Sequence, residues 1–153
     1  MMQNMKITQA LVAEHTIFLT VFDQIERVLP SLTTPIEVRT MASIVEGLLE
    51  THAKTETNLA YLALDHVLAA NGELKRMHQE HQEIDDRLRK VHAAKTCAEA
   101  RRLLKAALVT SREHFHGEER SVFPLLEKVL QEETLSQLGE TWMQRHVPAA
   151  SRI

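Results

Sequence analysis

LKRMHQEHQEIDDRLRKV, residues 74–91, is the stretch that decides the fold. Its apolar positions recur at steps of three and four residues, which is the spacing of one face of an α-helix. A histidine lies in the middle of this apolar series. The members of the series are Leu74, Met77, His81, Ile84, Leu88 and Val91. The pattern predicts an amphipathic helix that carries an imidazole toward the protein core.

The rest of the 153-residue chain has similar helical patterns and few residues that end helices. Four Gly and four Pro are too few turn residues for a fold of many β-strands. We expect breaks at Pro30–Pro35, at Asn71-Gly72 and, more weakly, at Lys95-Thr96, where the next helix has a capping-box spacing. The predicted helices are residues 8–29, 36–70, 73–94 and 97–131, with a short fifth helix near 134–146.

Long helices joined by short connections favour antiparallel neighbours. We therefore predict an all-α, up-down-up-down antiparallel four-helix bundle that forms a single domain over residues 1–153. The bundle should span about residues 8–131, and residues 132–153 should form a C-terminal extension with the short fifth helix. We expect Pro124 to kink the fourth helix or remove a turn of its hydrogen bonds. The second helix is long for its partners, so we expect it to unwind near Asp65.

Composition argues against several classes of function. The net charge of −3 is unlike the basic surface of a nucleic-acid-binding protein. The single cysteine, Cys97, excludes an internal disulfide and a CxxC metal or redox pair. The N-terminal residues do not resemble a targeting segment, and no run approaches the roughly 20 apolar residues that span a bilayer. We expect a cytoplasmic protein with neither a membrane nor a nucleic-acid partner.

Two duplicated motifs relate the halves of the chain. Residues 11–18, LVAEHTIF, align with residues 77–84, MHQEHQEI, at an offset of 66 residues. The spacing H-x-x-x-E occurs in residues 52–56 and again in residues 114–118, at an offset of 62 residues. A four-residue difference in one connection between helices accounts for the two offsets. The sequence therefore predicts two similar helical hairpins.

The duplicated motifs place metal-binding side chains in the predicted core. Four residues advance a helix by about 400°, so the His and Glu of each H-x-x-x-E motif share a face. Each hairpin thus directs two imidazoles and one carboxylate inward, and burying such groups without partners is costly. Two metal ions, each held by two histidines and bridged by both glutamates, would use all six groups. The predicted ligands are His15, His52, Glu56, His81, His114 and Glu118. A hydrogen-bonded polar network without metal is the alternative.

The donor set narrows the choice of metal. Mixed nitrogen and oxygen ligands suit iron, manganese or zinc. The sequence contains no HExxH motif and no CxxCH motif for haem. Ferritin-like bundles use two Glu-x-x-His motifs, and only Glu113 and His116 match one here. His116 lies two residues after His114, on about the opposite face of the helix, so we expect it to be exposed.

These motifs resemble the hemerythrin-like, or HHE cation-binding, family over about residues 8–130. The resemblance implies a non-haem di-iron centre with two Fe ions, an oxo or hydroxo bridge, and Glu56 and Glu118 as the bridging carboxylates. Oxygen-carrying hemerythrins have a fifth histidine where this chain has Met77, so the pattern is closer to the family's sensor and stress-response members. The resemblance implies a protein that binds or senses O2, nitric oxide, peroxide or iron. The alternative is a di-iron redox or stress enzyme that disproportionates peroxide or repairs iron–sulfur clusters.

Several neighbours of the predicted ligands have two interpretations. Glu14 and Glu80 precede the single histidines and are either exposed or hydrogen-bonding partners of the ligands. His78 could flank the site, and Glu119 could replace its neighbour as a ligand if the helix is rotated. Tyr61 lies about 180° around an ideal helix from the histidine of its own motif, so we expect it to face away from the site.

Overall fold

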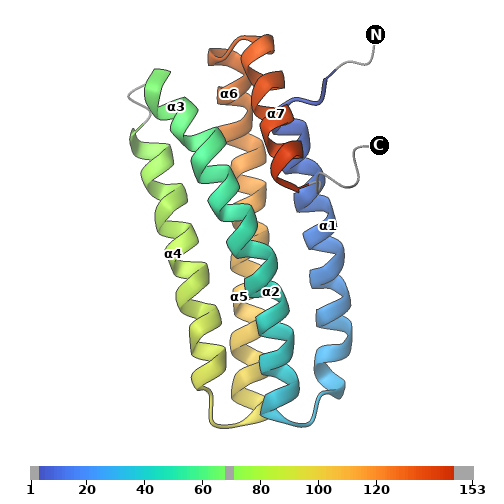
Figure 1. The fold of residues 1–153 in the computed structure, drawn as a ribbon. Helices are drawn as coiled ribbons and strands as arrows, with labels where there is room; N and C mark the ends of the chain where they lie inside the picture. The colour runs from blue at the N-terminus through green and yellow to red at the C-terminus, as the bar shows by residue number, and fades with distance from the viewer. Residues whose placement is uncertain (1–3, 68–70, 147–153) are drawn as a thin grey trace, which may run out of the picture.

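The computed structural model describes residues 4–67 and 71–146, and this part of the chain is almost entirely helical and has no strands (Figure 1). The helices are α1 (Ile7–Val28), α2 (Pro35–Glu56), α3 (Leu62–Val67), α4 (Asn71–Ala93), α5 (Cys97–Gly117), α6 (Phe123–Val129) and α7 (Glu132–His146). The predicted all-α helical bundle is confirmed. No helix in the described residues is long and apolar enough to span a membrane.

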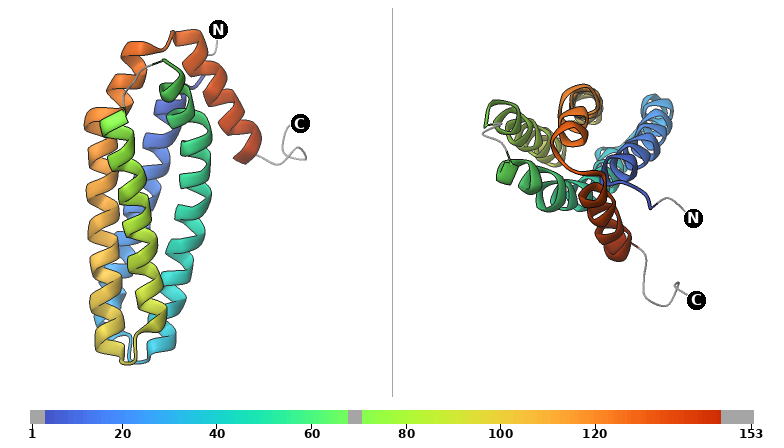
Figure 2. Two further views of the ribbon diagram at one scale, coloured as in Figure 1. Left: turned by 90° about the vertical axis from the view of Figure 1, so that its left-hand side faces the viewer. Right: turned by 90° about the horizontal axis from the view of Figure 1, so that it is seen from above.

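The four long helices α1, α2, α4 and α5 run side by side with alternating directions (Figure 1). The α1–α2 and α4–α5 connections lie together at one end of the bundle. At the opposite end, α6 bends over the bundle and α7 turns back to pack against α1 (Figure 2). The predicted fifth helix therefore forms, beginning at Glu132, and covers the N-terminal part of α1.

Local capping chemistry explains where two of the long helices begin. The Thr34 hydroxyl accepts a hydrogen bond from the backbone N–H three residues later, and Thr96 does the same at the start of α5. The helix start predicted near Thr96 is confirmed. In the predicted Pro30–Pro35 loop, Leu29–Ser31 form a short 3₁₀ helix, and Pro35 is the first residue of α2.

The boundary between the two halves differs from the prediction. Helix α4 begins at Asn71, so Asn71 and Gly72 belong to the start of this helix and do not form the break predicted there. Residues 68–70, which complete the predicted second helix, lie outside the described residues. Asp65 lies inside α3, so the predicted unwinding at this point is wrong.

Each half of the bundle contains a five-residue π-helical segment, which the sequence analysis does not predict. Thr57–Tyr61 joins α2 to α3, and Glu118–Val122 joins α5 to α6. Backbone hydrogen bonds in a π-helix span five residues, so each segment adds one residue to its turn. Pro124 follows directly, as the second residue of α6. The interruption expected at Pro124 thus takes the form of a π-helical segment, and the missing proline N–H falls where the α-helical hydrogen bonding is already altered.

The buried apolar side chains form two clusters that lie on either side of a polar layer. One cluster, toward the α1–α2 connection, includes Phe22 and Leu104. The other, toward α6 and α7, includes Leu11 and Leu126. Along α1 and α4, the predicted ligand histidine comes between residues of the first cluster and residues of the second. After α2 and α5, residues of the second cluster begin in the helical segments that follow. Buried apolar side chains therefore enclose the polar layer from both ends of the bundle.

We predict that Gly139→Ala destabilises the fold because α7 approaches the N-terminal segment closely. A Cβ at Gly139 would overlap the backbone carbonyl of Met5, and neither backbone can move without loosening α7. The expected loss is about 1–3 kcal/mol in the free energy of unfolding, measured by urea denaturation. The matched control is Gly47→Ala in α2, where a Cβ meets no atom within 4 Å. This control should gain about 0.5–1 kcal/mol. Equal effects of the two substitutions would contradict the close approach.

Candidate metal centre

The six residues predicted as ligands lie together in the polar layer of the bundle. The structure places His15 on α1, His52 and Glu56 on α2, His81 on α4, His114 on α5 and Glu118 at the start of the second π-helical segment. Five of the six are buried, and the His81 side chain is 16% exposed. Their proximity is thus a property of the fold, and their role as ligands stays a prediction.

The donor atoms form two overlapping groups. One group joins the two histidines of the first half to both glutamates, and the other joins the two histidines of the second half to the same glutamates. Within each group, one ligand atom from each residue lies within 4.8 Å of all the others. Because Glu56 and Glu118 belong to both groups, the arrangement matches two ions that share two bridging carboxylates.

The separations between donor atoms suit a transition metal. His15 Nε2 lies 3.1 Å from His52 Nε2, His81 Nε2 lies 3.3 Å from Glu56 Oε2, and His114 Nε2 lies 3.0 Å from Glu118 Oε1. Ligands at about 2.0–2.2 Å from a tetrahedral or octahedral ion lie about 3.0–3.6 Å from one another. The Nε2 atoms therefore converge at distances that a bound ion would require.

Several buried atoms of the layer have no hydrogen-bond partner among the described residues. They include both carboxylate oxygens of Glu56, Oε1 of Glu118 and Nε2 of His114. Leaving such an atom unpaired costs about 1–3 kcal/mol, and more for a charged group. A metal ion would supply the missing partners, and imidazole with carboxylate suits iron, manganese or zinc. The residues present therefore fit a metal centre.

A scan against protein-family models matches residues 6–126 to the hemerythrin HHE cation-binding domain. The chain belongs to this family. Searches of curated proteins and of solved structures found no match. The matched residues include the whole polar layer of this hemerythrin domain, whereas α7 lies beyond them. The family and the His/Glu cluster together support metal binding.

The pKa values of the two central carboxyls of the hemerythrin domain shift in opposite directions. Burial and the nearby Glu118 charge raise the pKa of Glu56 well above its usual value. Burial also opposes ionisation of Glu118, but contacts with Glu56 and His114 outweigh it and lower the pKa of Glu118. The raised pKa of Glu56 reduces the repulsion between two like charges in the core, and a bound cation would offset the same repulsion.

Two of the four histidines stay neutral in the core. Burial, together with the neighbouring imidazoles, lowers the pKa of His15 and of His81 to about 3. At His114 burial acts in the same direction, but Glu118 and Glu80 outweigh it and raise its pKa. Neutral imidazoles have a free nitrogen lone pair, so His15 and His81 are ready to bind a metal without first losing a proton.

Glutamates outside the cluster face the other ring nitrogen of three histidines. Glu80 Oε2 lies 2.7 Å from His114 Nδ1, and Glu14 Oε1 lies 3.4 Å from His52 Nδ1. Glu80 is therefore a hydrogen-bonding partner of His114, whereas Glu14 faces His52 at ion-pair distance without a hydrogen bond to its Nδ1. Glu119 Oε1 lies 3.6 Å from Nδ1 of His15 and belongs to neither donor group. A carboxylate at Nδ1 favours the tautomer whose Nε2 is free for metal.

Tyr61 faces the centre, contrary to the sequence-based expectation. Its hydroxyl donates a 2.6 Å hydrogen bond to Glu118 Oε2, and its ring stacks on His81. The prediction is wrong because Tyr61 ends the first π-helical segment, whose extra residue turns the following side chains by about 100°. A buried tyrosine hydroxyl usually needs a hydrogen-bond partner, and this is the one signal that could have indicated the contact.

Two histidines close in sequence to the predicted ligands, His78 and His116, do not join the cluster. His78 is exposed, belongs to neither donor group and packs edge-on against Tyr61. His116 is exposed, as expected.

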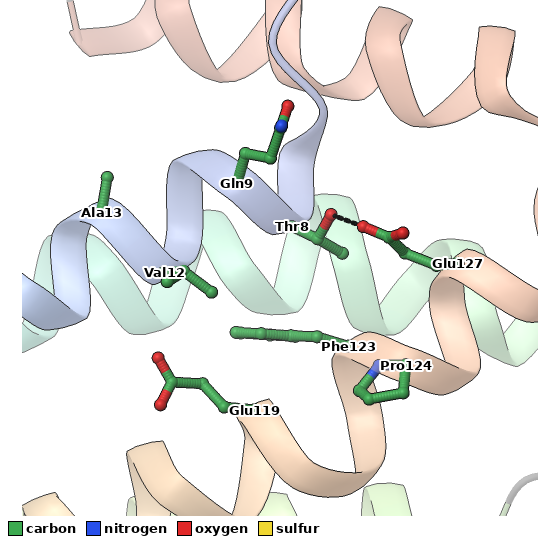
Figure 3. A pocket seen from close by; sticks show the side chains of 8 residues that line it. All are labelled: Thr8, Gln9, Val12, Ala13, Glu119, Phe123, Pro124 and Glu127. Atoms are coloured by element: carbon green, nitrogen blue, oxygen red, sulfur yellow. Dashed lines mark hydrogen bonds between the residues drawn. The ribbon is translucent and has the colours of Figure 1, made fainter.

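A groove of about 560 Å³ lies between the start of α1 and the α5–α6 junction (Figure 3). Phe123 and Glu119 line it, and Thr8 donates a hydrogen bond to Glu127 near its other end. Phe123 also stacks on His15, with 5.5 Å between ring centroids. The groove contains none of the six clustered side chains, because Phe123 separates it from the centre.

A much smaller cavity, of about 20 Å³, opens directly onto the cluster. His52, His81 and His114 line it, together with Ala53 and Asp85 on its outer side. A cavity of this size has room for about one water-sized molecule. The centre is therefore accessible only to a small ligand along this path.

We predict that Glu56→Gln stabilises the metal-free protein at neutral pH, because Gln resembles the protonated side chain. A carboxyl with a raised pKa contributes stability below about pH 4.5 and loses it as the pH rises toward its folded pKa. The advantage of the variant in free energy of unfolding should therefore grow between pH 4.5 and pH 7, by about 1–3 kcal/mol. Urea denaturation with a chelator present measures it. An advantage that does not change with pH would exclude a protonated Glu56.

Proposed function

We propose that this protein holds two iron ions in the polar layer and binds or senses a small oxidant or gas, namely O2, nitric oxide or peroxide, or iron itself. The observation that carries the proposal is the pair of overlapping donor groups that share Glu56 and Glu118. The unpaired donor atoms of the layer add support, because a bound cation would remove their cost.

In this proposal each half of the chain holds one ion. His15 and His52 would hold the first, His81 and His114 the second, and the two glutamates would bridge them. Bound iron supplies Lewis acidity and redox chemistry, while manganese or zinc would occupy the same donors with different redox properties. The protein contributes fixed ring orientations through the carboxylates at Nδ1 and largely excludes water from the layer.

The small cavity supports a diatomic gas or peroxide as the ligand. It lies against three of the histidines and is too small for a larger organic substrate. At the position where oxygen-carrying hemerythrins have a fifth histidine, this chain has the fully buried Met77, which carries a thioether in place of an imidazole. This arrangement favours binding or sensing at the second ion over dedicated oxygen transport. A cytoplasmic location stays a prediction from the sequence.

A redox or stress enzyme is the alternative, with peroxide disproportionation or repair of iron–sulfur clusters as its reaction. Both functions require an open position on a metal ion. They differ in turnover, since a sensor binds peroxide without consuming many equivalents. Fast peroxide consumption by the iron-loaded protein would therefore favour the enzyme.

We predict that anaerobic loading with Fe²⁺ gives about two irons per chain, measured by elemental analysis. His81→Ala and His114→Ala should each lose at least one iron and most of the rise in melting temperature on loading, because ligands that bind only the folded state stabilise it. The matched control is His116→Ala, which removes an exposed histidine near the same centre and should keep both irons. Full iron content in both ligand variants would refute the assignment.

We predict that Ala53→Leu hinders ligand entry without removing metal. Ala53 is half-buried and lines the small cavity, so a larger side chain would fill it. Azide or nitric oxide should bind the iron-loaded variant about tenfold more slowly, because the cavity holds only about one water-sized molecule. Stopped-flow absorbance measures the rate. Ala106→Leu, a half-buried helical alanine that does not line the cavity, is the matched control. Equal rates in both variants would place the entry path elsewhere.

A further inference from the structure

Helix α7 contacts Glu14, beside the polar layer, through a hydrogen bond from Trp142 and through His146 Nε2, which lies 4.0 Å from Glu14 Oε2. The Trp142 indole N–H donates a 2.7 Å hydrogen bond to Glu14 Oε1. The same carboxylate oxygen lies 3.4 Å from His52 Nδ1. The Glu14 side chain is 12% exposed, so water has little access to this contact. A continuous path of three side chains thus joins α7 to a histidine of the predicted centre.

The second half of the bundle achieves the same arrangement without α7. Its equivalent glutamate, Glu80, faces His114 and is held by Arg76, one turn earlier on its own helix, with Nη1 3.1 Å from Glu80 Oε1. The residue at the position of Arg76 in the first half is Ala10, which has no donor in its side chain. Trp142 therefore donates a hydrogen bond to Glu14, as Arg76 donates one to Glu80.

The docking of α7 is well defined by other contacts. Leu135 is buried in the apolar cluster next to the layer, and Gly139 packs against the backbone of Met5. His146 stacks on the Trp142 ring, and its Nδ1–H donates a 2.7 Å hydrogen bond to the Trp142 carbonyl oxygen. The indole therefore has a defined orientation over Glu14.

We propose that Trp142 is a positioning residue that couples α7 to the metal centre by holding Glu14 against His52. The inference rests on the proposed metal centre. Since coupling between two sites is reciprocal, occupancy of the centre and docking of α7 stabilise each other. Binding at the centre then changes the stability of a helix that lies outside the family-matched region, which gives a sensor a surface through which to signal.

The test is a double-mutant cycle on the full-length chain, with Co²⁺ as the metal probe. Glu14→Gln should weaken Co²⁺ binding by about 10–100-fold, as outer partners of metal ligands commonly do. Trp142→Phe, which keeps a ring but removes the N–H, should weaken binding by about 3–10-fold and alter the visible Co²⁺ spectrum. In the Glu14→Gln background, Trp142→Phe should cause little further loss, because its effect passes through Glu14.

Two controls separate positioning from simple packing of α7. Leu138→Ala loosens the packing of α7 on its apolar cluster without contacting Glu14, and it should leave the Co²⁺ spectrum unchanged. The second control uses the unaltered protein, so it does not depend on whether a variant folds. Hydrogen exchange of the α7 amides should slow when Co²⁺ is bound.

Three results would overturn the inference. The first is that Trp142→Phe binds Co²⁺ with the affinity of the unaltered protein. The second is that the losses of Co²⁺ affinity in Trp142→Phe and Glu14→Gln add fully in the double variant. The third is that the α7 amides exchange hydrogen at the same rate with and without metal. Each of these leaves the proposed metal centre intact if the unaltered protein binds Co²⁺. Failure of the unaltered protein to bind Co²⁺ would instead refute the centre, and the coupling with it.

Discussion

The burial of four imidazoles and two carboxylates in one layer is the constraint on which the rest of this structure depends. Apolar clusters enclose the layer at both ends, so water cannot solvate its polar atoms. The pKa of Glu56 is raised and that of Glu118 lowered, the pKa values of His15 and His81 are lowered, and outer carboxylates face Nδ1 atoms of the histidines. Donor atoms of the layer still lack partners among the described residues. Bound cations, as proposed here, would supply the partners that these atoms lack.

The two π-helical segments are the backbone features that complete this layer, because they rotate the side chains that follow them. The first begins directly after Glu56 and the second begins at Glu118. The extra residue rotates the helix, so that Tyr61 can donate to Glu118 while the glutamate keeps its place beside its histidine. Such segments interrupt regular hydrogen bonding, and they lie at nearly the same place in both halves. In the second half, the residue equivalent to Tyr61 is Phe123, which stacks on His15.

The two halves are alike in their ligands but unlike in what surrounds them. The second half is closer to solvent, since His81 is partly exposed and lines the small cavity. The first half is covered by Phe123 and, through Glu14, by α7. These differences assign separate tasks to the halves in our proposal. Small ligands reach the second ion, and the first ion is linked to the C-terminal helix.

The sequence by itself determined the helices, the antiparallel bundle and the six clustered side chains, because these follow from local periodicity. A step of four residues decides which face of a helix a histidine and a glutamate share, and duplication places that face in the core. The place of Tyr61, the pairing of Glu14 with His52 and the docking of Trp142 came only from the tertiary structure. They depend on a π-helical rotation and on contacts between segments far apart in the chain. Ideal helical spacing contains no information about either, since the free energy that decides them arises from packing across helices.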